Sequence, residues 1–121
     1  MGSPRSTYTQ HLLRNSADIR LVFKEGKRAS CLLFTLLYRW NGLGHTRVGV
    51  VVGKKLGGAV MRNRCKRRFR DLARLSLDVV PKGLDLLILP KRESATQPAK
   101  DLRESWQKVL SERVPQRKDV P

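Results

Sequence analysis

Two strand-like segments carry apolar side chains on both of their faces, and this limits the folds open to the chain more than any other feature. The segments are Leu32–Tyr38 and Thr46–Val52, and the turn sequence Asn41–Gly44 between them predicts a hairpin. Side chains alternate between the two faces of a strand. A sheet built from these segments therefore has to be covered, at least partly, on both sides.

Three segments with a helical period can supply that cover. The first runs from Asn15 or Ser16 to Glu25, the second from Ala59 to about Leu77, and the third from about Pro98 to Arg113. A further apolar strand, Leu84–Leu89, follows the second helix, and residues 91–97 are predicted to be a loop. The order helix, strands, helix, strand, helix predicts an α+β sandwich.

Gly26 is expected to close the first helix in the left-handed conformation. The 121 residues, 1–121, match one domain by size, with the ends 1–10 and 114–121 expected to be flexible. The longest apolar runs are too short to cross a bilayer, and the two cysteines, Cys31 and Cys65, sit in core-like patterns. A reduced, cytoplasmic protein is the simplest interpretation.

Positive charge is concentrated in one stretch, Lys54–Arg74, of a chain with a net charge of +16. The stretch holds nine basic residues and one acid, Asp71. An ordinary solvated helix face mixes signs to gain i,i+4 pairs, but here Arg62, Lys66 and Arg70 repeat one sign at that spacing. Because such a charge repels itself in the compact state, a polyanion is the expected partner, and nucleic acid is the commonest one.

The helical period separates the predicted second helix into an apolar arc and a basic face. The apolar arc holds Met61, Cys65, Phe69, Leu72 and Leu75, and the opposite face holds Asn63, Lys66, Arg67, Arg70 and Arg74. Arg68 falls inside the apolar arc and has no partner that the sequence can assign. Guanidinium groups bind phosphate oxygens in two-pronged fashion, so the basic face is suited to a nucleic-acid backbone.

The segment Gly57–Arg67, with Arg62-Asn63-Arg64 at its centre, resembles the signature of the protein subunit of bacterial ribonuclease P. Asp18 with Val22–Gly26, Arg47–Gly49 and Asp85 match other parts of that family's pattern. Two features depart from it. Ile19 stands where many members have an aromatic residue, and Cys65 and Gly58 replace commoner choices.

The resemblance implies a left-handed βαβ crossover, against the usual right-handed rule. It also implies a subunit that assists a catalytic RNA in removing the 5′ leader of precursor tRNA, so the expected partners are ribonuclease P RNA and precursor tRNA, with no membrane and no protein partner. The RNA would hold most of the Mg²⁺ and carry the chemistry, and the protein alone would be inactive. The residues expected to contact the catalytic RNA are Lys54, Lys55, Arg62, Asn63, Arg64, Lys66, Arg67 and Arg70.

A cleft between the first helix and the sheet is implied to take the single-stranded leader. Its candidate residues are Phe23, Lys24, Arg28, Phe34 and Tyr38. Aromatic side chains there would stack on bases, although Phe34 is as well suited to the core, and Trp40 and Trp106 are expected to serve in packing. The ten acids are scattered rather than clustered as a Mg²⁺-dependent nuclease requires.

Two other functions remain open at this point. A small ribosomal protein or RNA chaperone would carry a similar charge, and the ordered Arg62-Asn63-Arg64 motif argues against it. A basic helix lying on a membrane surface would need Trp, Phe and Leu opposite its charges. Helix 59–77 has part of such an arc, but the strands on either side of it need that arc for cover.

Overall fold

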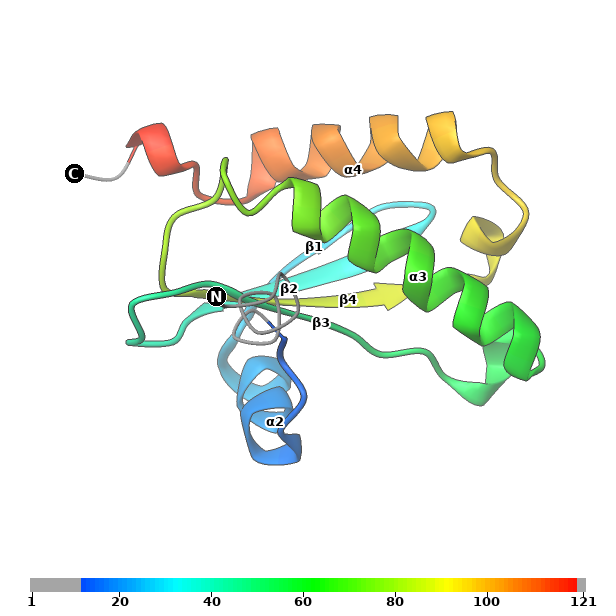
Figure 1. The fold of residues 1–121 in the computed structure, drawn as a ribbon, viewed down its shortest axis with the longest axis horizontal. Coiled ribbons are helices and arrows are strands. Elements are labelled where there is room, and N and C mark those ends of the chain that lie inside the picture. Colours follow the sequence, from blue (N-terminus) through cyan, green and yellow to red (C-terminus); the bar gives the residue numbers. More distant parts are fainter. Residues whose placement is uncertain (1–11, 120–121) are drawn as a thin grey trace, which may run out of the picture.

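The sheet at the centre of the fold has four strands, and helices lie on both of its faces (Figure 1). The structure is a computed structural model that describes residues 12–119. Its helices and strands are α2 (Ser16–Glu25), β1 (Lys27–Ser30), β2 (Phe34–Trp40), β3 (Arg47–Val50), α3 (Ala59–Leu75), β4 (Leu84–Pro90) and α4 (Ala99–Arg113). Short 3-10 turns form η1 (Lys54–Leu56), η2 (Arg92–Ala95) and η3 (Arg117–Asp119). This confirms the predicted α+β class.

The strand order is β1-β2-β4-β3, which corrects the predicted hairpin. β2 pairs antiparallel with β1 and with β4, whereas β3 pairs with β4, runs parallel to it, and forms a single further bridge from Val48 to Leu12. β4 separates the two segments that the sequence joined, because its residues 84–88 are buried on both faces and favour a central position. β1 was not predicted, since its sequence Lys-Arg-Ala-Ser lacks apolar alternation.

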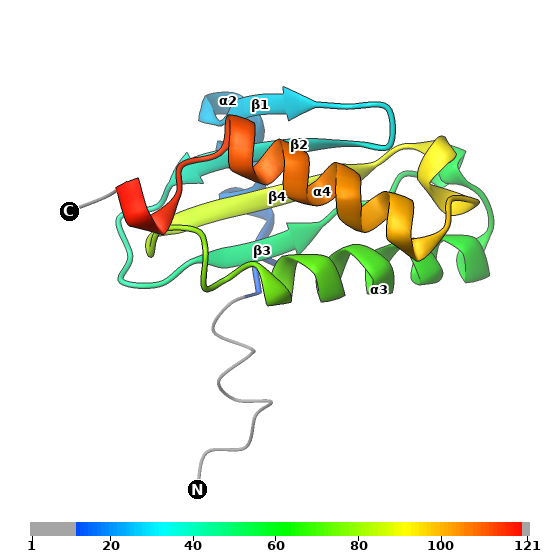
Figure 2. The same cartoon turned by 90° about the horizontal axis from the view of Figure 1, so that it is seen from above.

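The connection from β3 through α3 to β4 is left-handed, as the resemblance implied. Figure 2 looks onto the face that α3 and α4 cover, and there β3 and β4 both run from left to right with β4 above β3. The chain leaves β3, passes on the near side of the sheet through α3 and returns into β4. When β3 is turned to point upward, β4 lies to its left, opposite to the usual right-handed arrangement.

Each face of the sheet has its own apolar core. On the α3/α4 side, Phe34 is fully buried, with its ring 5.5 Å from that of Phe69 and 5.6 Å from that of Trp106. On the other side, Val22 of α2 packs with Leu37 and Leu87 of the central strands. The expectation that both faces need cover is therefore confirmed, and the smaller core explains why α2 is fixed to the sheet.

Both ends of α2 have a local cause. The Asn15 side-chain oxygen accepts hydrogen bonds from the backbone N–H groups of Ala17 (2.8 Å) and Asp18 (3.3 Å), so Asn15, one of the two residues at which the helix was expected to begin, caps it. Gly26 ends it, but with φ −71° rather than in the left-handed region. A glycine fits there for a different reason, because a Cβ atom would lie 2.4 Å from the carbonyl oxygen of Val22.

Part of the C-terminal tail, predicted to be flexible from residue 114, is packed instead. Val114 is buried in the main core. The backbone N–H of Arg117 donates to the carbonyl of Val79 at 2.8 Å, and its guanidinium donates to the carbonyls of Val80 and Leu77. A charged residue thus fixes the tail through backbone carbonyls, which sequence composition does not reveal. The other predicted flexible end, 1–10, lies outside the described residues.

Candidate nucleic-acid interface

α3 places its basic side chains on the side that faces away from the core. Phe69 and Ala73 are buried against the sheet, and Cys65 is buried against Leu56 of η1 and Ala95 of η2. The outward side, together with η1, forms what we call the α3 basic face: Lys54, Lys55, Arg62, Asn63, Arg64, Lys66, Arg67 and Arg70. All eight were predicted to act together. Arg62 and Lys66 are half-buried at the margins of the face, and the other six are exposed.

The charge of the α3 basic face is not neutralised within residues 12–119. None of its seven cations forms an ion pair with an acid there. The Nε atom of Arg62 is buried and has no hydrogen-bond acceptor in the described part of the chain. Asn63, Lys66, Arg67 and Arg70 line one open depression on the helix surface, together with Asp71 and Arg74, which are paired with each other. Such a surface presents several unpaired donors to an anionic backbone.

The start of α3 adds backbone donors to this face. Gly58 precedes the helix, and no side chain caps its first turn. Gly57 has φ +142°, a conformation that side-chain-bearing residues rarely adopt, and it turns the chain from η1 into α3. The free N–H groups of a helix N-terminus favour an anion, so they reinforce the positive potential made by Lys54 and Lys55.

Arg68, which the sequence left without a partner, has a structural role. Its guanidinium donates to the backbone carbonyls of Ser94 and Gln97, which lie in and just after η2. Arg68 therefore connects α3 to the segment that leads into α4. This contact explains a charged residue inside the apolar arc and removes Arg68 from the candidate interface.

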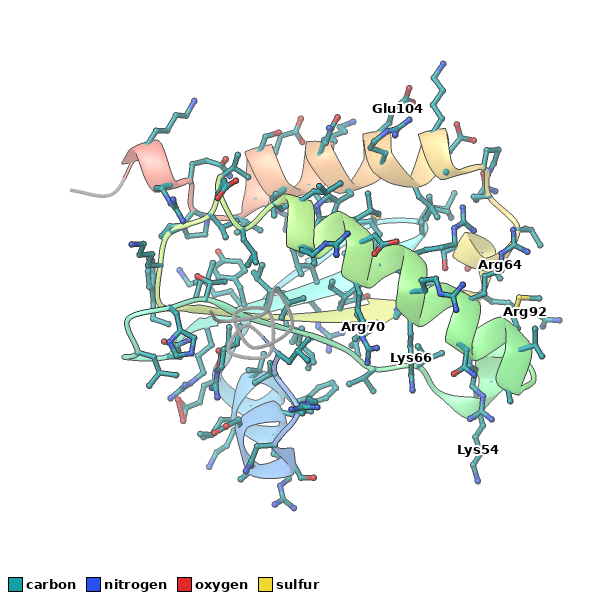
Figure 3. All side chains as sticks on the ribbon, in the orientation of Figure 1. Lys54, Arg64, Lys66, Arg70, Arg92 and Glu104 are labelled. Carbon is teal, nitrogen blue, oxygen red and sulfur yellow. The ribbon has the colours of Figure 1, made fainter. Side chains whose placement is uncertain are left out.

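The α3 basic face extends around the edge of the sheet. β3 is the edge strand, and α3 packs beside it. Figure 3 shows the side chains of Lys54, Lys66 and Arg70 pointing toward the side of the sheet on which α2 lies. The basic side chains and the α2 side of the sheet thus adjoin.

An ion-pair network fixes α2 at one position along the strands, which we call the Asp85 level. Arg47 of β3 donates from Nε and Nη2 to the two carboxylate oxygens of Asp85, at 2.9 and 2.7 Å, and from Nη1 to Asp18 of α2 at 3.0 Å. Asn41 Nδ2 donates to Asp85 at 2.8 Å. The hydrogen bond to Asp85 raises the pKa of Arg47 above its ordinary value, against a smaller effect of burial. The three residues that matched the family pattern at separate positions meet here.

The same arrangement leaves the opposite end of the strands only partly covered by α2. Glu25, near the end of α2, contacts Arg39, which lies opposite Asp85 in the strand register. Both acidic contacts of α2 are therefore at the Asp85 level. Toward the opposite end of the strands, Thr35, Val51 and Leu89 form what we call the sheet strip. Val51 and Leu89 are only partly buried.

Phe23 is placed beside the sheet strip. Ile19 and Val22 face the sheet, and at 100° per residue Phe23 lies on one flank of α2 while Asp18 lies on the other. Because the Asp18 flank faces Arg47, the Phe23 flank faces the strip. The Phe23 side chain is 44% exposed. Arg28 is exposed on the same side of the sheet, since it lies opposite Leu37 in the register.

Three of the predicted cleft residues are not on this surface. The prediction that Phe34 lines the cleft is wrong, because its side chain points to the α3/α4 side and is fully buried against Phe69 and Trp106. Tyr38 packs against that same core, so it also faces away from α2. Lys24 falls on the side of α2 opposite Ile19 and Val22, so it points away from the sheet. The alternation of β2 agrees with the sequence pattern, but nothing in the sequence tells which face α2 covers.

The strip residues themselves were missed. Leu89 and Val51 belong to segments predicted as strands, but their proximity depends on the parallel pairing of β3 with β4. The neighbouring apolar residues Leu37 and Leu87 look the same in sequence, yet they are buried under α2. Only the position of α2 distinguishes the open pair from the covered pair.

Within residues 12–119, no helix is long and apolar enough to cross a membrane. In the same part of the chain, no three His, Cys, Asp or Glu side chains gather as ligands for a metal ion.

Comparison with known proteins gives one family. The family model of ribonuclease P matches residues 8–113. The ribonuclease P protein component of Thermotoga maritima is 42% identical over 81 residues, 67% of this chain and 69% of the relative, and that of Kocuria rhizophila is 31% identical over 106 residues, 88% and 94%. The solved structure of the Thermotoga maritima RNase P protein with 1-(4-fluorophenyl)-2-thiourea has a TM-score of 0.75 and 36% identity, covering 83% of this chain and 97% of that one.

Proposed function

The chain belongs to the family of bacterial ribonuclease P protein components, and from this premise we propose how its two adjoining surfaces share the work. Membership implies partnership with the ribonuclease P RNA. We assign contact with that RNA to the α3 basic face, and contact with the 5′ leader of precursor tRNA to the sheet strip and Phe23. The product is the mature 5′ end of the tRNA, made in the cytoplasm.

One observation carries the first assignment: seven cations lie together without an acidic partner in residues 12–119. Leaving them unpaired costs stability through mutual repulsion, and an RNA backbone removes that cost. Arg62, with its buried and unpaired Nε, and Arg64 present forked donors to phosphates. Asn63 between them adds a neutral donor and acceptor.

The second assignment follows from the sheet strip. Leader nucleotides are single-stranded, so their bases have free faces that stack on exposed rings. Among residues 12–119, Phe23 is the exposed ring on this side, and the part-exposed side chains of Val51 and Leu89 give an apolar floor. Lys54, Lys66 and Arg70 point toward the same side. A strand lying on the strip would therefore have cations beside its phosphates.

We assign the chemistry to the RNA, with the protein inactive on its own. Mg²⁺ supplies the activated water or stabilises the leaving oxygen in such a hydrolysis, and in this proposal the RNA holds most of it. Two acids on the α2 side of the sheet, Asp18 and Asp85, support this division, because both are bound to Arg47. This leaves Arg47 to position α2, and Phe23 to orient the leader.

The test is binding of the purified protein to a bacterial ribonuclease P RNA. Replacing Arg62 and Arg64 together by Ala should weaken assembly at least tenfold, because hydrogen bonds to charged groups contribute about 1.5–3 kcal/mol each. A matched control replaces Arg103 and Lys108, two exposed cations of α4 outside the α3 basic face, and should bind like the unchanged protein. Equal loss in both variants would mean that only the net charge matters and would contradict the assignment.

A further inference from the structure

Trp40 at the end of β2 is exposed in a way that folding does not explain. Its side chain is 50% exposed, whereas Trp106, the other tryptophan, is 1% exposed and donates its indole N–H to Ser76 Oγ at 2.7 Å. Within residues 12–119 the Trp40 indole N–H has no hydrogen-bond acceptor. A half-exposed indole stabilises the fold less than a fully buried one, because less of its apolar surface is removed from water. Binding of a ligand is another reason for a tryptophan to stand at the surface.

Trp40 lines a hollow of about 330 Å³ together with a second aromatic residue. Tyr38 lies two residues earlier on the same face of β2 and is part-exposed. Lys27 of the edge strand β1 lies opposite Tyr38 in the register. The ion pair between Glu25 and Arg39 and the ring of Pro115 complete the wall.

Of the two cations that line the hollow, one is paired with an acid and the other is not. Arg39 is engaged with Glu25, with Nε 3.4 Å from the carboxylate oxygen. Lys27 is exposed, and its ammonium group has no acid or hydrogen-bond acceptor among residues 12–119. The hollow therefore combines two aromatic rings with a cation that no described residue neutralises. Aromatic stacking together with a cation for the backbone is the combination that proteins use to bind single-stranded nucleic acid.

The spacing of Tyr38 and Trp40 along the backbone of β2 suits a base. Side chains at i and i+2 of a strand project about 6.6–6.8 Å apart. This is twice the separation of about 3.4 Å between successive bases in a stack. We propose that this hollow binds an unpaired nucleobase of a single-stranded RNA segment, with the base stacked on Trp40 and the adjoining phosphate held by Lys27.

This site is separate from the two surfaces already assigned. Tyr38 packs against the core on the α3/α4 side, and Trp40, two residues further along β2, projects from the same face, opposite to the sheet strip. β2 runs antiparallel to β4 and hence opposite to β3, so Trp40 lies at the far end of the sheet from the start of α3, where Figure 3 labels Arg64. The proposal rests on the proposed function only in taking RNA as the ligand.

Fluorescence tests the proposal, because only one of the two tryptophans is exposed. The full-length protein is titrated with a 5′-labelled hexa-adenylate RNA, and binding is followed in parallel by anisotropy of the label and by tryptophan emission. Saturating RNA should quench the emission of the unchanged protein. In Trp40→Phe the residual emission, which comes from buried Trp106, should not change. Trp40→Ala should weaken binding about fivefold or more, while Trp40→Phe keeps most of the affinity.

Two controls separate this site from the α3 basic face. Replacing Arg62 and Arg64 by Ala should raise the concentration of RNA required but leave the quenching at saturation unchanged. Leu32→Ala, which removes an exposed apolar side chain elsewhere, should have no effect on affinity or quenching. An abasic oligomer of the same length should bind without quenching, since it has phosphates but no bases.

The contrary results are distinct for the two proposals. Two results would overturn the proposal for Trp40 and leave that for the α3 basic face untouched. One is saturation of the anisotropy signal by RNA without quenching of Trp40. The other is quenching by the abasic oligomer as strong as that by hexa-adenylate. Trp40 quenched as described, combined with wild-type assembly of the Arg62 and Arg64 variant with ribonuclease P RNA, would overturn the proposed function and leave the Trp40 site standing.

Discussion

Replacing Arg47 by Met should destabilise the protein more than any other single change of an exposed or half-exposed charge. Met keeps the length of the side chain and removes the guanidinium. The carboxylate of Asp85, which is 1% exposed, would then keep the amide of Asn41 as its only donor among residues 12–119. An isolated buried charge of this kind costs about 3–5 kcal/mol of unfolding free energy. That is a large part of the total for a domain of this size.

Two matched variants calibrate this value. Arg39→Met removes a cation at the same level of the sheet, but its partner Glu25 is 50% exposed, so the decrease in stability should be at most about 1 kcal/mol. Asp18→Ala removes the more exposed of the two partners of Arg47 and should also cost about 1 kcal/mol or less. Arg47→Met combined with Asp85→Leu removes both buried charges and should restore most of the stability that Arg47→Met alone removes.

The assay is equilibrium urea unfolding followed by circular dichroism, with all variants at one pH between 6 and 8, a range in which the raised pKa keeps Arg47 charged. The free energy of unfolding should be highest for the unchanged protein. It should be slightly lower for the two single variants Asp18→Ala and Arg39→Met, and lowest for Arg47→Met. A decrease in Arg47→Met no greater than that in Arg39→Met would refute the reasoning, because the buried carboxylate would then need no partner. A double variant as unstable as Arg47→Met would refute it as well.

Three further predictions concern RNA. Changing Lys66 and Arg70 to Ala should reduce the slope of log affinity against log salt by about 0.7–0.9 for each phosphate that the variant no longer neutralises; an unchanged slope in a folded variant would move the interface elsewhere. Phe23→Ala should weaken binding of precursor tRNA but not of mature tRNA, with a thermal melt to confirm folding; an undiminished preference would exclude Phe23 as a leader contact. Ile19→Phe should tighten precursor binding if the first helix faces the leader, and unchanged affinity would argue against that placement.

The sequence predicted the fold class and the α3 basic face because both depend on local patterns. Helical periodicity alone separates Cys65 and Phe69 from Lys66 and Arg70, and the structure keeps that separation. The resemblance added the left-handed crossover, which no local pattern encodes. The two predictions made from periodicity need only residues that are near one another in the chain.

The errors arose where the answer depends on contacts between distant segments. β4 lies between β2 and β3, and only the stability of the whole sheet decides that order. The same order, with α2 on one face, determines that Phe34 is in the core and Leu89 at the open strip. Arg68 is a further example, since its partners are backbone carbonyls of Ser94 and Gln97, in a distant segment, and carbonyls leave no mark in the sequence pattern.

The most direct test of the central claim is cleavage of precursor tRNA by a bacterial ribonuclease P RNA at a series of Mg²⁺ concentrations, with and without this protein. The protein should lower the Mg²⁺ concentration needed for half-maximal cleavage. The variant with Arg62, Asn63 and Arg64 replaced by Ala should do so less, and the protein without RNA should leave precursor tRNA intact. Cleavage by the protein alone, or an unchanged Mg²⁺ requirement in its presence, would contradict the account.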